Sequence, residues 1–292
     1  MTGIRIGLVQ TTTGLSPERN AAQLLQAIKD LAGQGAETVF LPEMCGLLDR
    51  NGPRLRAAAR SEADDPVLAA LQDAAARHRL PIAIGSLAIR PSAGDGRLAN
   101  RSFVLGADGG ILARYDKMHL FDVELSSGER YRESASFLAG DGARLVDLPW
   151  GRLGLAVCYD LRFPALHGAL ASAGADIIAQ PSSFTVPTGT AHWHVLLRAR
   201  AIETGCFVVA AAQTGCHEDG RQTYGHSLVV NPWGAVLLDM GEAPGTATID
   251  IDLGEVAAAR ARIPSLRHGR AIGEAMLAEA TATGATATGA AP

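Results

Sequence analysis

The feature that most constrains this chain is the alternation of short apolar strands with helix-length segments in its first 90 residues. Alternating apolar residues predict the strands, and apolar residues spaced three to four apart predict the helices. The expected strands are 4–10, 38–41 and 82–87, and the expected helices are 17–32, which starts at Ser16-Pro17, and 66–79. This order favours an α/β fold with helices outside the sheet.

The rest of the chain adds hairpins to this pattern. The sequence Asp108-Gly109-Gly110 is a strong turn signal between two apolar runs. Further strands are expected at 101–105, 111–115, 153–157, 176–179, 207–212, 227–230, 236–238 and 246–251, and further helices at 164–173 and 191–204. Parallel and antiparallel neighbours together predict mixed sheets with outer helices, in one domain.

We divide the chain into one domain over residues 1–270 and a tail over 271–292. The tail is dominated by Ala, Thr and Gly. A segment of this composition contributes little to a core, so we expect it to be disordered or to dock weakly on a partner subunit.

Charge and apolar content exclude several classes of protein. The formal net charge is −4 without a basic block, so neither a nucleic acid nor an anionic membrane is an expected partner. No apolar run approaches the roughly 18 residues that span a bilayer, and the first ten residues resemble a strand rather than a signal peptide. The four cysteines form no C-x-x-C pair, which suits a reducing compartment. We therefore expect a soluble, cytoplasmic protein.

Cys158 is the first candidate for chemistry. It follows an apolar strand and precedes a helix in G-L-A-V-C-Y-D-L-R-F-P. At such a junction the thiol projects from a sharp turn, the following backbone N–H groups can face an oxyanion, and a helix N-terminus would favour the thiolate. The competing interpretation is an inert core cysteine, and we keep that interpretation for Cys45, Cys206 and Cys216.

The base for such a nucleophile can be sought among the eight histidines. A Cys–His site as in papain-like hydrolases is one possibility. His192 and His194 lie on one predicted helix, but residues i and i+2 point about 200° apart, so they do not easily share a metal ion or a base role.

A second possibility uses carboxylates and a lysine at strand ends. Glu43 follows one predicted strand and Lys117 follows another. Because functional crevices form at the carboxyl ends of strands, Glu43, Lys117 and Cys158 would meet in one crevice. There Glu43 could act as general base and Lys117 could stabilise an oxyanion, while Glu133 could orient the lysine or a water. Each of the three charged residues could also be an ordinary surface side chain.

Three blocks make the sequence resemble a known family. The runs L-P-E at 41–43, Y-D-K-M-H-L-F-D at 115–122 and C-Y-D-L-R-F-P at 158–164 are similar to the signature blocks of the nitrilase-like carbon–nitrogen hydrolases. Five further blocks match: P-S-S-F at 181–184, T-G-T-A-H-W at 188–193, R-A-R-A-I-E at 198–203, Y-G-H-S at 224–227 and N-P-W-G at 231–234. The resemblance covers about residues 3 to 265. Thr190 departs from it, because close relatives often carry Pro there.

The resemblance implies a four-layer α-β-β-α sandwich of two mixed sheets with outer helices. It implies a Glu43–Lys117–Cys158 triad assisted by Glu133, with no metal and no organic cofactor. Cys158 would attack an amide carbonyl and form a thioester, while Lys117 and the backbone N–H of Tyr159 stabilise the oxyanion. It also implies a homodimer or larger homo-oligomer, paired through the helices after the nucleophile and near 190–204.

Within the family, the chain looks closest to the deaminated glutathione amidases, through L-L-R-A-R-A-I-E-T, V-V-A-A-A-Q and Y-G-H-S. This implies an anionic ω-amide substrate that yields 2-oxoglutarate and cysteinylglycine. Candidate pocket residues are Arg162, Arg198, Phe184 and Thr185, although both arginines could instead be structural ion-pair partners. An ω-amidase for 2-oxoglutaramate, an N-carbamoyl-amide hydrolase, a true nitrilase and a non-catalytic scaffold on the same fold remain alternatives.

Overall fold

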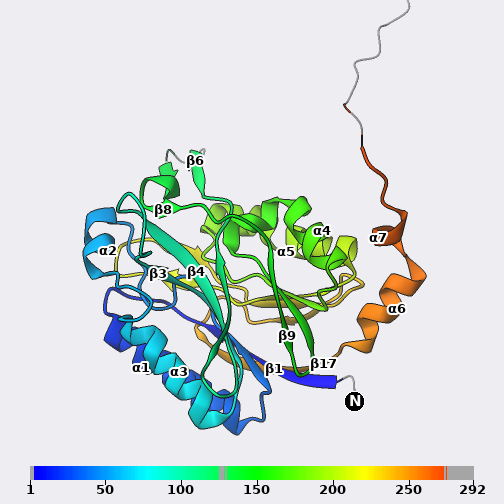
Figure 1. Cartoon of the computed structure of the whole chain (residues 1–292), viewed down its shortest axis with the longest axis horizontal. Helices are drawn as coiled ribbons and strands as arrows, with labels where there is room; N and C mark the ends of the chain where they lie inside the picture. Colours follow the sequence, from blue (N-terminus) through cyan, green and yellow to red (C-terminus); the bar gives the residue numbers. More distant parts are fainter. Residues whose placement is uncertain (1–2, 125–127, 129, 273, 275–292) are drawn as a thin grey trace, which may run out of the picture.

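The chain folds into two stacked β-sheets with helices on both outer faces (Figure 1). The computed structural model describes residues 3–124, 128, 130–272 and 274. The expected α/β class, a four-layer sandwich of two mixed sheets, is confirmed. Among the described residues, no helix combines the length and the apolar character needed to cross a membrane.

The first sheet has seven strands in the order β17-β1-β2-β3-β4-β5, with β8 pairing to β4. Its strands are β1 (Gly3–Gln10), β2 (Thr38–Phe40), β3 (Ile82–Ile89), β4 (Leu98–Leu105), β5 (Ile111–Asp116), β8 (Phe137–Leu138) and β17 (Gly245–Asp252). Strands β1, β2 and β3 are parallel, while β17, β4 and β5 pair with their neighbours antiparallel. Strands β2, β3 and β5 therefore end at the same edge of the sheet.

The second sheet has six strands in the order β16-β15-β12-β11-β10-β9. Its strands are β9 (Arg144–Leu148), β10 (Gly151–Leu155), β11 (Ile177–Ala179), β12 (Phe207–Ala210), β15 (Leu228–Val230) and β16 (Val236–Asp239). Again three central strands, β10, β11 and β12, are parallel, and antiparallel strands flank them. The mixed topology follows from helical crossovers in the centre and hairpins at the edges.

The outer helices cover the sheets with apolar faces. Helices α1 (Pro17–Gly33) and α3 (Pro66–His78) cover the first sheet, and α4 (Pro164–Ser172) and α5 (Val186–Thr204) cover the second. Helix α1 begins as expected, because the Ser16 side chain caps it and Pro17 occupies its first turn. Its buried residues Leu24, Ile28 and Leu31 follow helical spacing and join the core.

Most predicted element ends differ from the observed ones by three residues or fewer, and two differences bear on the site. Strand β10 ends at Leu155, before the expected 157, and Cys158 opens a 3-10 helix, η2 (Cys158–Arg162). Helix α5 begins at Val186 rather than 191, because Pro187 fits the first turn of a helix, where no N–H is needed.

Several elements escaped the sequence-based prediction, and most of them are too short for a periodic pattern. They are α2 (Gly52–Ala58), β6 (Asp122–Glu124), β7 (Arg130–Arg132), η1 (Glu133–Ala135), β8, β9, β13 (Thr214–Cys216), β14 (Gln222–Tyr224), α6 (Gly254–Arg262) and α7 (Ser265–His268). Strands β6 and β7 form one hairpin, and β13 and β14 form another. Several of these elements surround the site described below.

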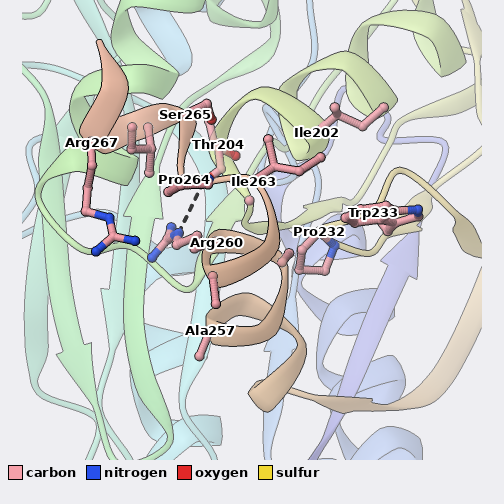
Figure 2. Close-up of a pocket in the computed structure, with 14 residues that line it drawn as sticks. Ile202, Thr204, Pro232, Trp233, Ala257, Arg260, Ile263, Pro264, Ser265 and Arg267 are labelled. Carbon is pink, nitrogen blue, oxygen red and sulfur yellow. Dashed lines mark hydrogen bonds between the residues drawn. The ribbon is translucent and has the colours of Figure 1, made fainter.

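Helices α6 and α7 lie outside the sandwich (Figure 1). Between them and α5 is a largely apolar cavity of about 550 Å³ that includes Ile202, Trp233 and Ile263 (Figure 2). These three side chains are exposed. Of the expected tail 271–292, all but residues 271, 272 and 274 lie outside the described residues.

Candidate active site

Glu43, Lys117, Glu133 and Cys158 line one pocket of about 340 Å³. Glu43 follows β2, Lys117 directly follows β5 and Cys158 follows β10, while Glu133 opens η1. The structure thus brings together all four residues that sequence reasoning singled out. The stacking of two sheets explains the convergence, because the end of β10 faces the strand ends of the first sheet.

Lys117 is held between two carboxylates. Its Nζ lies 3.0 Å from Oε1 of Glu43 and 2.8 Å from Oε2 of Glu133. Asn100 donates from Nδ2 to the same two carboxylates, at 2.9 Å and 3.1 Å. The side chains of Lys117 and Glu43 are 2% and 5% exposed, so these contacts lie almost entirely away from water. Short, buried contacts of this kind fix the ammonium in one position.

The electrostatics keep Lys117 charged. Burial by itself would lower the pKa of this lysine, but Glu133 and Glu43 together outweigh burial and raise the pKa well above its usual value. The residue is therefore a fixed cation that can stabilise negative charge in the pocket, and not a proton acceptor at neutral pH.

The backbone of Cys158 is strained. Its φ of 50° lies in the left-handed region that non-glycine residues rarely adopt. Hydrogen bonds hold this conformation: the Cys158 N–H donates to the Pro181 carbonyl at 2.8 Å, and Nε2 of Gln180 donates to the Cys158 carbonyl at 3.2 Å. The expected sharp turn after the strand is therefore present. Hydrogen bonds to the residues that follow β11 compensate for its strain.

The expected support of a Cys158 thiolate by a helix N-terminus is not found. Burial raises the pKa of the Cys158 thiol well above its usual value, Glu43 raises it further, and Lys117 opposes both. The physical reason is that Cys158 opens a single 3-10 turn, while α4 begins only at Pro164, so no α-helix N-terminus supports the anion. In the resting site the thiol is protonated and needs a base.

Asp160 is a residue of this site that sequence reasoning missed. Its side chain is fully buried and accepts hydrogen bonds from the Val157 N–H at 2.8 Å, the Tyr115 hydroxyl at 2.6 Å and the His119 N–H at 3.0 Å. It thereby connects the turn that carries Cys158 with the segment that carries Lys117. The available signal was an acidic residue inside an otherwise apolar run.

Two glycines allow the backbone to approach the catalytic strand ends. A Cβ at Gly85 would lie 2.2 Å from the Leu41 carbonyl oxygen and 2.4 Å from the Pro42 carbonyl carbon, just before Glu43. A Cβ at Gly140 would lie 2.0 Å from the Asp116 carbonyl oxygen, just before Lys117. Both positions need glycine for close approach.

The predicted pocket residues Tyr159, Arg162, Phe184 and Thr185 all line this cavity. The Arg162 guanidinium lies 6.0 Å from the Tyr159 ring centroid and 5.7 Å from that of Phe184. Arg198 does not line the cavity; its Nε donates to the Gly234 carbonyl at 2.8 Å. Sequence reasoning missed four further arginines of the wall, which no local pattern distinguishes: Arg50, Arg130, Arg132 and Arg221.

None of the eight histidines, all within the described residues, lines the pocket. His119 is stacked on Phe163 with ring centroids 3.6 Å apart, and its Nδ1 faces Asp160 at 2.6 Å. His192 faces Arg162 at 3.3 Å. The pocket therefore places Glu43, and no histidine, together with Cys158.

Comparison with known proteins agrees with this geometry. The family model described as carbon-nitrogen hydrolase matches residues 5–261. A deaminated glutathione amidase of Synechocystis sp. is 40% identical over 264 residues, which cover 89% of this chain and 96% of that protein. The nitrilase and fragile histidine triad fusion protein of Caenorhabditis elegans has a solved structure with a TM-score of 0.86 at 38% identity, covering 92% of this chain and 66% of that one.

The structure of a third relative reports on the reactivity of that protein's own active site cysteine. An amidase of Nesterenkonia sp. AN1 is 26% identical, with a TM-score of 0.75, and the match covers 89% of this chain and 98% of that one. Its structure is described as showing the Michael addition of acrylamide at the active site cysteine.

Proposed function

Because this chain belongs to the carbon–nitrogen hydrolase family, we propose that Cys158, Lys117 and Glu43 hydrolyse an amide bond through a thioester intermediate. The chain is a hydrolase of carbon–nitrogen bonds other than peptide bonds, an amidase of the nitrilase superfamily. The observation that carries the residue assignment is the buried contact of Lys117 with Glu43 and Glu133 in the pocket that also contains Cys158.

In the first half of the reaction, Glu43 accepts the thiol proton while Sγ of Cys158 attacks the amide carbonyl. The raised pKa of this thiol makes the base necessary, because little thiolate exists beforehand. Nζ of Lys117 and the backbone N–H of Tyr159 stabilise the oxyanion. Glu43 returns the proton to the leaving nitrogen, the C–N bond breaks, and a thioester with Cys158 remains.

In the second half, Glu43 takes a proton from water, and the resulting hydroxide attacks the thioester carbon. The C–S bond breaks, the acid product leaves and the proton returns to Cys158. Glu133 accepts from Nζ of Lys117 and from the Phe121 N–H at 2.7 Å, so it holds the lysine in place through both steps.

The wall of the pocket supports an anionic substrate. Six cationic side chains line it against three carboxylates. Two of these carboxylates, Glu43 and Glu133, share Lys117 as their ion-pair partner, and the third, Asp49, is paired with Arg54. Within the described residues, Arg50, Arg132 and Arg162 form no ion pair, so they can bind substrate carboxylates.

We propose deaminated glutathione as the substrate, cleaved to 2-oxoglutarate and cysteinylglycine. This molecule carries a carboxylate at each end, which suits the several guanidinium groups of the pocket wall, and relatives such as the Synechocystis protein bear this activity in their name. A shorter monoanion such as 2-oxoglutaramate is the second candidate, because its single carboxylate would use fewer of the arginines. Carbamoyl amides and nitriles share the same triad chemistry.

The test is release of 2-oxoglutarate from deaminated glutathione, with 2-oxoglutaramate, an N-carbamoyl amide and a nitrile in parallel. Turnover should be fastest for deaminated glutathione and absent from Cys158→Ala, while Cys216→Ala, which removes an exposed thiol, keeps full activity. Faster turnover of another compound would identify that compound as the better substrate and would leave the proposed triad unaffected. Activity retained in Cys158→Ala would overturn the nucleophile, and activity retained in Glu43→Gln would favour a Cys–His site.

We also propose a homodimer in the cytoplasm. The apolar side chains of Val195 and Ile202 on α5 and of Ile263 after α6 are 68%, 53% and 58% exposed. Contact of these side chains with water is unfavourable, and burial in a subunit interface would remove it. All four cysteines are unpaired, as in a reducing compartment. Light scattering should give twice the chain mass, and Val195→Glu combined with Ile202→Glu should give a monomer. A monomeric wild type would contradict the dimer.

A further inference from the structure

We propose that His194, His226 and Asp239 form a binding site for a divalent transition-metal ion, for which Zn²⁺ is the best fit. The three residues come from α5, from the turn after β14 and from the end of β16. None of them lines the pocket of Cys158, and the hydrolytic mechanism above uses none of them. The site is therefore independent of the proposed function.

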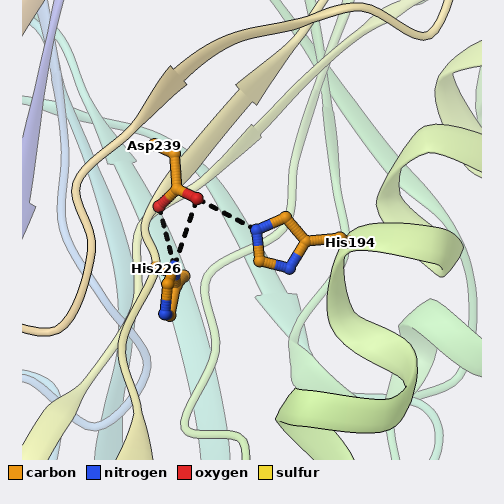
Figure 3. A group of neighbouring side chains, drawn as sticks. All are labelled: His194, His226 and Asp239. Atoms are coloured by element: carbon orange, nitrogen blue, oxygen red, sulfur yellow. Dashed lines mark hydrogen bonds and ion pairs between the residues drawn. The ribbon is translucent and has the colours of Figure 1, made fainter.

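The three side chains point toward one another (Figure 3). Nε2 of His194 lies 3.0 Å from Oδ2 of Asp239, and Nδ1 of His226 lies 2.9 Å from Oδ1 of the same carboxylate. One ligand atom from each residue lies within 4.8 Å of the other two. Zn²⁺ binds nitrogen and oxygen at about 2.0–2.2 Å, so ligand atoms of a tetrahedral site lie roughly 3.4 Å apart. The two histidine–carboxylate distances already fall below this spacing.

The donor set matches zinc chemistry. Two imidazoles and one carboxylate are the ligands of open zinc sites, in which water supplies the fourth ligand. The side chains are 33%, 20% and 34% exposed for His194, His226 and Asp239, so an ion and its water can enter from solvent. The carboxylate lowers the positive charge of the complex and attracts the cation.

The backbone around His226 is built to present its ring. Its φ of 55° is left-handed, which is strained for a side chain of this size. Two hydrogen bonds stabilise this conformation: the His226 N–H donates to the Gly241 carbonyl at 2.7 Å, and Nε1 of Trp193 donates to the His226 carbonyl at 2.7 Å. The ring is stacked on Tyr224, with centroids 4.5 Å apart.

Asp239 is oriented as well. Its Oδ1 accepts from the Gly241 N–H at 2.9 Å, which leaves the carboxylate facing both imidazoles. Such outer contacts orient the ligands of metal sites. Because the ligands come from three separate elements, a bound ion would link the outer helix α5 to the edge of the second sheet and stabilise the fold.

The experiment uses the full-length chain carrying Cys158→Ala and Cys216→Ala, because thiols bind zinc, after dialysis against EDTA. Titration with Zn²⁺ alone, followed by calorimetry, should show one ion per chain, and Zn²⁺ should raise the Tm. His194→Ala, His226→Ala and Asp239→Asn should each weaken binding about tenfold or more and abolish the rise in Tm. His78→Ala, a partly exposed histidine at the end of α3, is the matched control and should change neither.

Co²⁺ provides a second readout, since its visible absorption reports coordination geometry directly. Absorption typical of a four- or five-coordinate ion, lost in His226→Ala, supports the site. Circular dichroism in EDTA verifies that each variant is folded, and Asp239→Asn keeps a hydrogen-bonding group if an alanine variant unfolds. The proposal would be overturned if the three substitutions left stoichiometric binding unchanged, or if Zn²⁺ did not raise the Tm. The two histidines would then only form hydrogen bonds with the carboxylate.

Discussion

The hydroxyl of Tyr115 donates to Oδ2 of Asp160 at 2.6 Å, and this hydrogen bond joins the strand that leads to Lys117 with the turn that carries Cys158. Both side chains are buried. Burial of Tyr115 and the negative charge of Asp160 raise the pKa of the Tyr115 hydroxyl, so this hydroxyl remains a donor at any physiological pH. The distance between lysine and cysteine therefore depends on a carboxylate that touches neither of them.

Asp160→Asn tests this dependence. The amide has one acceptor oxygen where the carboxylate has two, and its NH₂ group faces N–H donors. We expect the free energy of unfolding to fall by about 2–4 kcal/mol and kcat to fall with little change in KM. Urea unfolding and steady-state kinetics measure both. Tyr115→Phe removes one donor only and should cost about 1–2 kcal/mol. An Asp160→Asn variant with full stability and kcat would contradict this role.

Glu43→Gln and Lys117→Met should separate turnover from thiol reactivity. Glu43→Gln removes the base, so turnover should fall by about a hundredfold or more. It also removes a negative charge that raises the pKa of Cys158, so alkylation by iodoacetamide at pH 7.5 should not slow. Lys117→Met removes the opposing cation, so the pKa of Cys158 should rise further and alkylation should slow. The reverse order of alkylation rates would refute this electrostatic account.

Gly85→Ala should disturb the active site although Gly85 does not line the pocket. The added Cβ overlaps the backbone of Leu41 and Pro42 and must displace Glu43. We expect a loss of about 3 kcal/mol in unfolding free energy and at least tenfold in kcat, because small misplacements of a catalytic group are costly. Gly33→Ala is the control, since no atom lies within 4 Å of its added Cβ, and it should be neutral or slightly stabilising. Equal effects of both substitutions would contradict the argument.

His217 should make the fold sensitive to acid. Burial lowers the pKa of this imidazole, whose Nδ1 faces the Thr13 carbonyl at 2.9 Å and whose Nε2 faces the Thr223 hydroxyl at 2.7 Å. The unfolded chain takes up a proton near pH 6.5 while the folded chain does not, so stability is complete above this pH and is lost below it. One such group contributes a slope of about 1.4 kcal/mol per pH unit. Urea midpoints between pH 7.5 and 5.5 measure the slope, which His217→Asn should reduce; an unchanged slope would exclude His217 as its source.

The elements that could be predicted from the sequence are those with a local physical signal. Helix α1 has a Ser16 cap, an N-terminal proline and apolar residues at helical spacing, and it occurs where these features place it. The position of Glu43 and Lys117 after strands also follows from local pattern. The identity of the candidate triad came from three sequence blocks in a recognisable order, and not from periodicity.

Only the tertiary structure decided what depends on residues far apart in the chain. It showed that Cys158 opens a 3-10 turn, where burial and Glu43 raise the pKa of its thiol against the opposing effect of Lys117. It gathered the arginines of the pocket wall and the His194–His226–Asp239 cluster, which have no common spacing in the sequence. A single sequence records which side chains exist and what their neighbours along the chain favour; charge, burial and coordination depend on distances that arise only when two sheets stack.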